Sequence, residues 1–225
     1  LLRRHGLRRL DHYAIFMENN ARYIEACAAG ERAGLYYTCI NSHLNAEELA
    51  FIVNDSLARV LITSRAQREV ALAAFAACPR LELLLMLDAG PDDTPFVDYE
   101  GAIAAMPATP IADESLGGAM LYSSGTTGRP KGVLRPLPEA APEELTPLFR
   151  ALHTMWHHRP GMVYLSPAPL YHSAPQAAVN LTLRSGGTAV IMERFDPEQF
   201  LALVERHRVS HSQLVPTMFS RMLKL

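Results

Sequence analysis

Segments of strand length alternate with segments of helix length along most of the chain, and this alternation is the strongest constraint on its fold. Short apolar runs predict strands, whereas longer segments with apolar residues at helical spacing predict helices. When the two alternate, the strands form a parallel sheet and the helices cover its faces. The sequence therefore predicts an α/β fold. The expected strands are residues 12–17, 35–40, 59–63, 81–87, 162–165, 188–192 and 209–215.

Several expected helices begin at side chains that can accept hydrogen bonds from the first free backbone N–H groups. Asn45, with Glu48 three residues later, supplies both halves of a capping box. Similar starts are predicted at Asn20, at Ser64 with Gln67, and at Asp196 before Pro197. The expected helices are 21–33, one after Asn45, 65 to about 77, 143–157, 176–184, one from 197 and one from 216.

Residues 89–118 differ in composition from the segments on either side. Prolines punctuate this stretch, and a pair of glycines ends it. Such clusters are typical of loops. We therefore expect residues 89–118 to connect a first α/β lobe, residues 1–88, to a second lobe, residues 119–225.

A segment rich in serine, threonine and glycine opens the second lobe. Residues 123–132 read Ser-Ser-Gly-Thr-Thr-Gly-Arg-Pro-Lys-Gly. Glycine lets backbone N–H groups approach a ligand closely, the hydroxyls add donors and the lysine adds positive charge, so the segment favours a polyphosphate. It is not the common P-loop, because Lys131 is followed by Gly132 and Val133 instead of a Ser or Thr that opens a helix. A strand is expected after it.

This segment, with Tyr122 before it and Val133 after it, resembles the signature loop of the adenylate-forming superfamily. That superfamily includes acyl-CoA synthetases, aryl-CoA ligases, luciferases and the adenylation domains of peptide synthetases, and in it the loop holds the phosphates of ATP. The resemblance also implies Mg²⁺, shared between Ser123 and a glutamate outside this chain. The implied phosphate-binding residues are Ser123, Ser124, Gly125, Thr126, Thr127, Gly128 and Lys131.

A second segment resembles the same superfamily. Residues 166–174 read Ser-Pro-Ala-Pro-Leu-Tyr-His-Ser-Ala, and in relatives a proline, an apolar residue and an aromatic residue precede a histidine. The resemblance implies that Tyr171 and His172 line the site of the acyl group and the adenylate. Considered by itself, a histidine in a loop is more often a structural hydrogen-bonding residue than a catalytic one.

The resemblance covers the whole chain and is strongest to fatty-acyl-CoA synthetases. It implies that residues 1–225 form two partial lobes of the large N-terminal domain of such an enzyme. Family members continue with adenine-binding and ribose-binding motifs and with a small C-terminal domain that holds a catalytic lysine. We therefore expect no catalytic residue within this chain, and we expect the chain alone to be inactive.

The implied activity is the ATP-dependent conversion of a carboxylic acid, here a fatty acid, to an acyl-adenylate and then to an acyl-CoA. The substrates would be the acid, ATP with Mg²⁺, and coenzyme A. Two alternatives remain open. The enzyme could pass its acyl group to a carrier protein instead of to CoA, or the chain could be a truncated, inactive nucleotide-binding fragment.

Composition excludes several other classes of protein. The formal net charge is −2, without the basic excess of a nucleic-acid-binding protein. No apolar run approaches the ~20 residues that a transmembrane helix needs. The three cysteines are far apart and form no Cys-x-x-Cys pair, which favours reduced thiols and a cytoplasmic protein.

A further candidate metal site consists of two histidines at helical spacing, His153 and His157. Side chains four residues apart on a helix can share a zinc ion. However, no glutamate follows His153 as the metalloprotease pattern requires. The sequence therefore favours a solvated helix face over a metal site.

Overall fold

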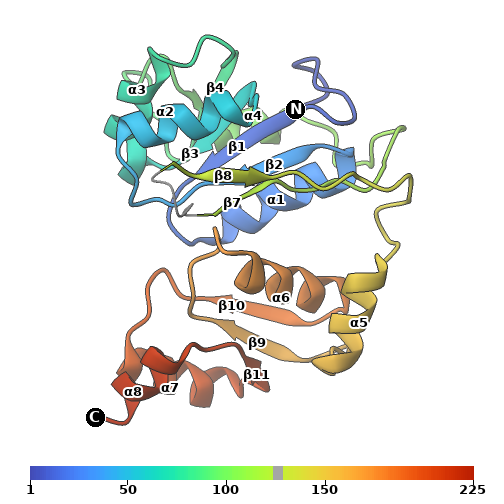
Figure 1. The fold of residues 1–225 in the computed structure, drawn as a ribbon, viewed down its shortest axis with the longest axis vertical. Coiled ribbons are helices and arrows are strands. Elements are labelled where there is room, and N and C mark those ends of the chain that lie inside the picture. Colours follow the sequence, from blue (N-terminus) through green and yellow to red (C-terminus); the bar gives the residue numbers. More distant parts are fainter. Residues whose placement is uncertain (124–128) are drawn as a thin grey trace. The chain divides into compact units, whose positions relative to one another are not determined.

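The computed structural model describes residues 1–123 and 129–225 (Figure 1). These residues form two compact units. The first contains Leu1–Glu18 and Glu25–Glu144, and the second contains Asn19–Ile24 and Leu145–Leu225. In each unit parallel strands are joined through helices, which confirms the predicted α/β class.

The first unit is built on a six-stranded sheet with the order β5-β4-β3-β1-β2-β6, in which every neighbouring pair is parallel. Its strands are β1 (His12–Phe16), β2 (Tyr36–Cys39), β3 (Val60–Thr63), β4 (Leu83–Met86), β5 (Val97–Asp98) and β6 (Gly118–Ala119). Its helices are α1 (Ala21–Ala33, of which residues 25–33 belong to this unit), α2 (Ala46–Asp55), α3 (Arg68–Phe75) and α4 (Tyr99–Ala104).

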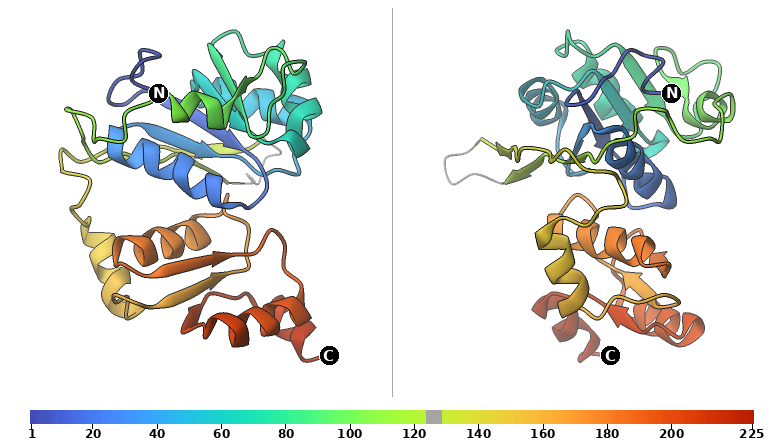
Figure 2. Two further views of the ribbon diagram at one scale, coloured as in Figure 1. Left: turned by 180° about the vertical axis from the view of Figure 1, so that it is seen from behind. Right: turned by 90° about the vertical axis from the view of Figure 1, so that its right-hand side faces the viewer.

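Both faces of this sheet are buried, and alternate residues of the central strand show why. Ala14 and Phe16 of β1 belong to a buried cluster with residues of α2 and α3. Tyr13 points to the opposite face, where its hydroxyl donates a hydrogen bond to the carbonyl oxygen of Ala26 in α1. Figures 1 and 2 show α1 on one face of the sheet and α2 with α3 on the other.

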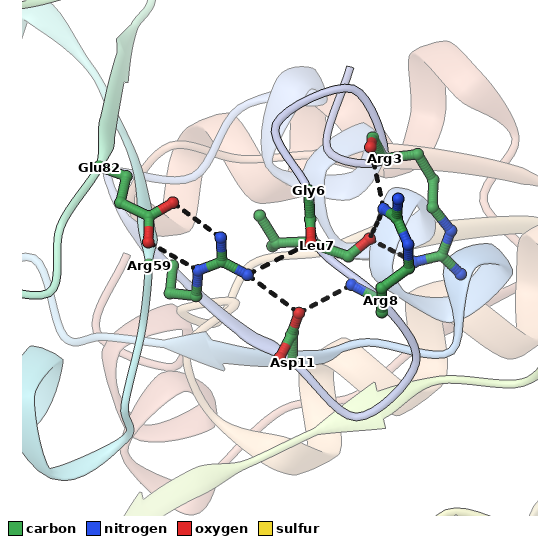
Figure 3. Close-up of polar contacts among 7 residues, drawn as sticks. All are labelled: Arg3, Gly6, Leu7, Arg8, Asp11, Arg59 and Glu82. Carbon is green, nitrogen blue, oxygen red and sulfur yellow. Dashed lines mark hydrogen bonds and ion pairs between the residues drawn. The ribbon is translucent and has the colours of Figure 1, made fainter.

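An arginine joins the amino ends of three neighbouring strands (Figure 3). Arg59, just before β3, donates two hydrogen bonds to the carboxylate of Glu82, at 2.9 and 2.8 Å. It also donates to Asp11, just before β1, at 3.1 Å. Asp11 accepts a further hydrogen bond from the backbone N–H of Arg8, which holds the N-terminal segment against this end of the sheet.

Of two predicted capping signals, the one at Asn45 forms in the structure and the one at Ser64 does not. The capping box of Asn45 and Glu48 is present at the start of α2, as predicted. Ser64 precedes a 3₁₀ turn and makes no side-chain capping hydrogen bond; its hydroxyl donates to the carboxylate of Glu18 at 2.5 Å. The chain after Ser64 first makes a 3₁₀ turn, Arg65–Gln67, and α3 then ends at Phe75.

The segment expected to be a connector, residues 89–118, contains regular structure within the first unit. It holds β5, α4 and β6, and β5 and β6 form the two edges of the sheet. Asp98 begins α4, because its carboxylate accepts a hydrogen bond from the N–H of Gly101 at 2.7 Å. The prolines of this segment are therefore compatible with short regular elements between them.

The second unit contains a three-stranded parallel sheet with the order β10-β9-β11. Leu165, Met192 and Phe200 form its buried centre. The last strand is shorter than expected, since only two of its residues pair with β9. The elements are α5 (Pro147–Met155), β9 (Val163–Ser166), α6 (Ser173–Arg184), β10 (Thr188–Ile191), α7 (Pro197–His207), β11 (His211–Ser212) and α8 (Pro216–Met222).

Prediction for Gly117. A Cβ atom at Gly117 would lie 2.1 Å from the carbonyl oxygen of Gly30 and 2.6 Å from that of Leu35. Both are backbone atoms, so the contact can be relieved only by moving β6 away from its neighbours. We expect Gly117→Ala to lower the free energy of unfolding by about 2 kcal/mol, a typical cost of overpacking, as measured by urea denaturation.

Gly90→Ala is the matched control. A Cβ atom at Gly90 would meet its nearest neighbour, an oxygen of Asp93, at 3.5 Å, which is ordinary van der Waals contact. We expect a change within about 0.5 kcal/mol for this variant. Equal losses for the two alanine variants would contradict the close approach at Gly117.

His158 is buried in the second unit, next to other aromatic rings. Its ring centroid lies 5.8 Å from that of His153 and 6.0 Å from that of Trp156, and its Nδ1 atom has no hydrogen-bond partner. Burial lowers the pKa of His158 below its usual 6.5, and positive charge on His153 and His211 lowers it further. The folded chain therefore resists protonation of this ring.

Prediction for pH. As pH falls below 6.5, the unfolded chain takes up a proton at His158 before the folded chain does, so the free energy of unfolding decreases until the lower folded pKa is passed. We expect urea denaturation to show lower stability at pH 5.5 than at pH 7.5. His158→Phe should reduce this difference without abolishing it, because the pKa values of His172 and His211 are also lowered by burial. An unchanged difference in the variant would contradict the assignment.

Candidate functional site

The two strands that flank the predicted phosphate-binding segment form a hairpin. Strand β7 (Leu121–Ser123) pairs antiparallel with β8 (Lys131–Val133), so a strand does follow the segment, as predicted. Ser123 and Lys131 are direct partners in this pairing, and both are exposed. The remaining predicted phosphate ligands, Ser124, Gly125, Thr126, Thr127 and Gly128, lie outside the described residues.

Tyr122 attaches the first strand of the hairpin to helix α2. Its hydroxyl donates a hydrogen bond to the carboxylate of Asp55, the last residue of α2, at 2.6 Å. Burial and this hydrogen bond raise the pKa of Tyr122 well above its usual value. The ring packs against the core cluster of the first unit. Tyr122 therefore holds β7 against α2 and the core of the first unit, while the neighbouring Ser123 is exposed.

Gly132 is required by the same packing. A Cβ atom there would lie 2.5 Å from the terminal methyl of Met120 and 3.0 Å from the ring of Tyr122. Glycine therefore lets β8 lie close to the side chains of Met120 and Tyr122. The glycine that ends the motif in the sequence thus has a packing role.

Arg129 makes a second contact with helix α2. Its guanidinium carbon lies 5.5 Å from the centre of the Phe51 ring, within the range of a cation–π interaction. Phe51 and Asp55 are one helical turn apart, so the same helix contacts the chain on both sides of residues 124–128. Sequence reasoning missed both residues, because no local pattern links them to the motif.

Tyr171 and His172 lie in the loop between β9 and α6, in the second unit. Their ring centroids are 4.5 Å apart, with the planes at 54°. Burial raises the pKa of Tyr171 and lowers the pKa of His172. His172 occupies the N-cap position of α6, but its side chain makes no capping hydrogen bond. The imidazole is therefore not used to cap the helix.

Sequence reasoning also missed Asn19, which contacts this loop. Its side-chain nitrogen donates to the carbonyl oxygen of Ala168 at 2.9 Å, and its side-chain oxygen accepts from the N–H of Leu170 at 2.8 Å. Asn19 stands about 150 positions earlier in the sequence than these partners. The predicted phosphate-binding and acyl-binding residues thus belong to different units, the hairpin to the first and this loop with Asn19 to the second.

The predicted helical pair of histidines does not form. Helix α5 ends at Met155, and His157 follows with a left-handed φ of 52°, so His153 and His157 do not share a helix face. Within residues 1–123 and 129–225, no group of three or more His, Cys, Asp or Glu side chains is arranged to hold a metal ion. In the same part of the chain, no helix combines the length and apolar character needed to cross a bilayer.

Comparison with known proteins identifies the family. The family model described as AMP-binding enzyme matches residues 1–225. The chain is 32% identical over 219 residues to a feruloyl-CoA synthase from an Amycolatopsis species, covering 97% of this chain and 41% of the relative.

Solved structures share the fold. An ATP-bound structure of MatB from Rhodopseudomonas palustris matches with a TM-score of 0.77 and 26% identity, over 100% of this chain and 43% of that one. A fatty acyl CoA synthetase from Mycobacterium tuberculosis matches with a TM-score of 0.83 and 22% identity, over 100% and 42%. The predicted acyl-CoA synthetase fold is therefore confirmed, and the chain spans less than half the length of each of these proteins. Since the family model covers the chain from its first residue to its last, the chain belongs to the AMP-binding enzyme family.

Proposed function

We propose that the protein to which this chain belongs activates a carboxylic acid with ATP and transfers the acyl group to coenzyme A. The observation that carries the proposal is the hairpin of β7 and β8. It presents Ser123 and Lys131 as exposed, directly paired residues on the two sides of the segment predicted to bind phosphate, in a chain of the AMP-binding enzyme family. The carboxylate would attack the α-phosphate of ATP, giving an acyl-adenylate and pyrophosphate. The thiol of CoA would then displace AMP.

The task of the hairpin would be electrostatic. As pyrophosphate leaves, negative charge builds on its oxygens, and fixed donors near those oxygens stabilise the transition state. Lys131 would supply positive charge, and Ser123 would donate to a phosphate oxygen or ligate Mg²⁺. Mg²⁺ favours oxygen ligands and phosphate groups, which suits an exposed hydroxyl at the end of a strand. Ser124, Gly125, Thr126, Thr127 and Gly128 would add further donors.

Tyr171 and His172 would form one wall of the acyl and adenylate site. Their rings are in contact, Tyr171 is partly buried and His172 is exposed. Desolvation lowers the pKa of His172 below its usual 6.5, which favours the neutral imidazole near pH 7. A neutral ring can accept or donate a single hydrogen bond next to a carboxylate without forming an ion pair with it. This environment suits an acid whose carboxylate must remain free to attack the phosphate.

Two classes of carboxylic acid are candidate substrates for this site. The local sequence around residues 165–174 resembles fatty-acyl-CoA synthetases, which favours a fatty acid. The relative at 32% identity is a feruloyl-CoA synthase, which favours an aromatic acid. We retain a fatty acid as the first candidate substrate and an aromatic acid, such as ferulic acid, as the second.

The test is the acid-dependent exchange of labelled pyrophosphate into ATP by the full-length protein. We expect exchange with a medium-chain or long-chain fatty acid, and formation of the matching thioester when CoA is added. Exchange with ferulic acid alone would reassign the substrate class. Transfer to a phosphopantetheinylated carrier protein, but not to CoA, would reassign the acceptor. No exchange with any acid would contradict the proposed activity.

Prediction for Lys131. We expect Lys131→Ala in the full-length protein to lower the rate of pyrophosphate exchange about 100-fold, the usual cost of losing one electrostatic contact to the transition state. Thioester formation from supplied acyl-adenylate should change far less, because no pyrophosphate leaves in that step. The two half-reactions are measured separately by isotope exchange and by thioester release.

Lys224→Ala is the matched control, since Lys224 is the only other lysine in the chain and lies exposed after α8. It removes the same charge at a position outside the hairpin. Both half-reactions should keep their wild-type rates. If Lys131→Ala slowed the two half-reactions equally, its role at the leaving pyrophosphate would be refuted.

A further inference from the structure

Asn19 makes three hydrogen bonds to backbone groups that come from two separate segments of the second unit. In addition to its bonds with Ala168 and Leu170, its side-chain nitrogen donates to the carbonyl oxygen of Met192 at 3.0 Å. Met192 directly follows strand β10, whereas the other two residues lie in the loop after β9. The side chain of Asn19 is buried, with 8% of the residue exposed.

These hydrogen bonds hold the loop on both sides of Pro169. Ala168 is held through its carbonyl oxygen and Leu170 through its N–H, while the fully buried Leu170 side chain anchors the loop in the core. Proline fixes its own φ, so little freedom remains between the two held positions. Tyr171 and His172 come next, and the N–H of His172 bonds back to the carbonyl oxygen of Pro169 at 3.2 Å.

The geometry selects asparagine over its close relatives. Two of the partners are carbonyl oxygens, which need donors, and the third is an N–H, which needs an acceptor. Among short polar side chains, only that of asparagine offers two N–H donors together with an acceptor oxygen. Aspartate would place a negative charge against two carbonyl oxygens, and alanine would leave three buried backbone groups without this partner, at a cost for each.

We propose that Asn19 is a positioning residue for the acyl site: it fixes the loop that carries Tyr171 and His172 to the end of β10 and thereby sets where these two rings stand. The assignment of an acyl group to these rings rests on the proposed function, whereas the positioning itself does not. Asn19 is not assigned any contact with the reacting atoms.

The first experiment observes the loop directly, without enzyme activity. The chain is labelled with ¹³C at histidine and ¹⁵N at the backbone, and the His172 signal is assigned with His172→Gln. In Asn19→Asp we expect the His172 ring signal to move, its pKa to rise toward 6.5 as the loop loosens, and the Leu170 amide to exchange with solvent at least about tenfold faster. Asn19→Ser introduces no charge and serves as the second variant if Asn19→Asp fails to fold.

Ser212→Ala is the control for a general loss of stability. The Ser212 hydroxyl donates to the carbonyl oxygen of Leu165 at 2.8 Å, so this variant also removes a side-chain hydrogen bond to the backbone within the second unit. It leaves the contacts of Asn19 in place, and the signals of His172 and Leu170 should stay at their wild-type positions. Unchanged loop signals in the Asn19 variants, or equal changes in Ser212→Ala, would overturn the positioning role.

The second experiment uses the full-length protein with the acid identified by pyrophosphate exchange. We expect the Asn19 variants to raise KM for the acid about tenfold while KM for ATP stays unchanged, since the loop is assigned to the acyl group. If the loop signals change but KM for the acid does not, the link to the acyl site is overturned. If the loop signals change but the wild-type protein activates no acid, the proposed function fails while the positioning by Asn19 stands.

Discussion

Parallel pairing governs the architecture of both units. When neighbouring strands run in the same direction, each connection must return over a face of the sheet, so helices cover the faces and the strand ends gather at opposite edges. In the first unit, Arg59 joins the amino ends of three strands through the carboxylates of Glu82 and Asp11 (Figure 3). Residues with a proposed function occur elsewhere: Tyr171 and His172 follow the carboxyl end of β9. Loops at the carboxyl ends of parallel strands are a common place for ligand contacts, because nearby strand ends bring together residues distant in sequence.

The hairpin of β7 and β8 departs from this pattern, since it is antiparallel and contributes to neither larger sheet among the described residues. A two-stranded hairpin is only marginally stable alone. Its stability must therefore come from packing, and helix α2 supplies it through Asp55 and Phe51. The same helix has a complete capping box at its other end, which fixes its first turn. Helix α2 therefore supports the chain on both sides of residues 124–128, at Tyr122 and at Arg129.

The sequence predicts those elements whose determinants are local. Strand β1, helix α1 and the starts of α2 and α7 agree closely with the predicted positions, because apolar spacing and capping side chains act within a few residues. Errors arose where a distant partner competed. Ser64 has the pattern of a helix cap, but its hydroxyl is oriented toward Glu18, 46 residues away, and makes no capping hydrogen bond. Residues 89–118 resembled a linker because their strands have only two residues each and pair with β4 and β2, which the local composition cannot reveal.

Two consecutive asparagines show the difference between a role set by local sequence and a role set by distant partners. Asn20 accepts a hydrogen bond from the N–H of Tyr23, three residues later, and its role as a helix cap could be predicted from spacing alone. Asn19 has the same side chain, but its three partners lie between 149 and 173 residues away. Its role follows from the requirement that buried backbone groups be paired, which appears only when the strand ends are brought together. The predicted phosphate-binding motif can be read from the sequence because its residues are contiguous. The residues that contact its flanking strands, and those that hold the loop of Tyr171 and His172, are visible only in the fold.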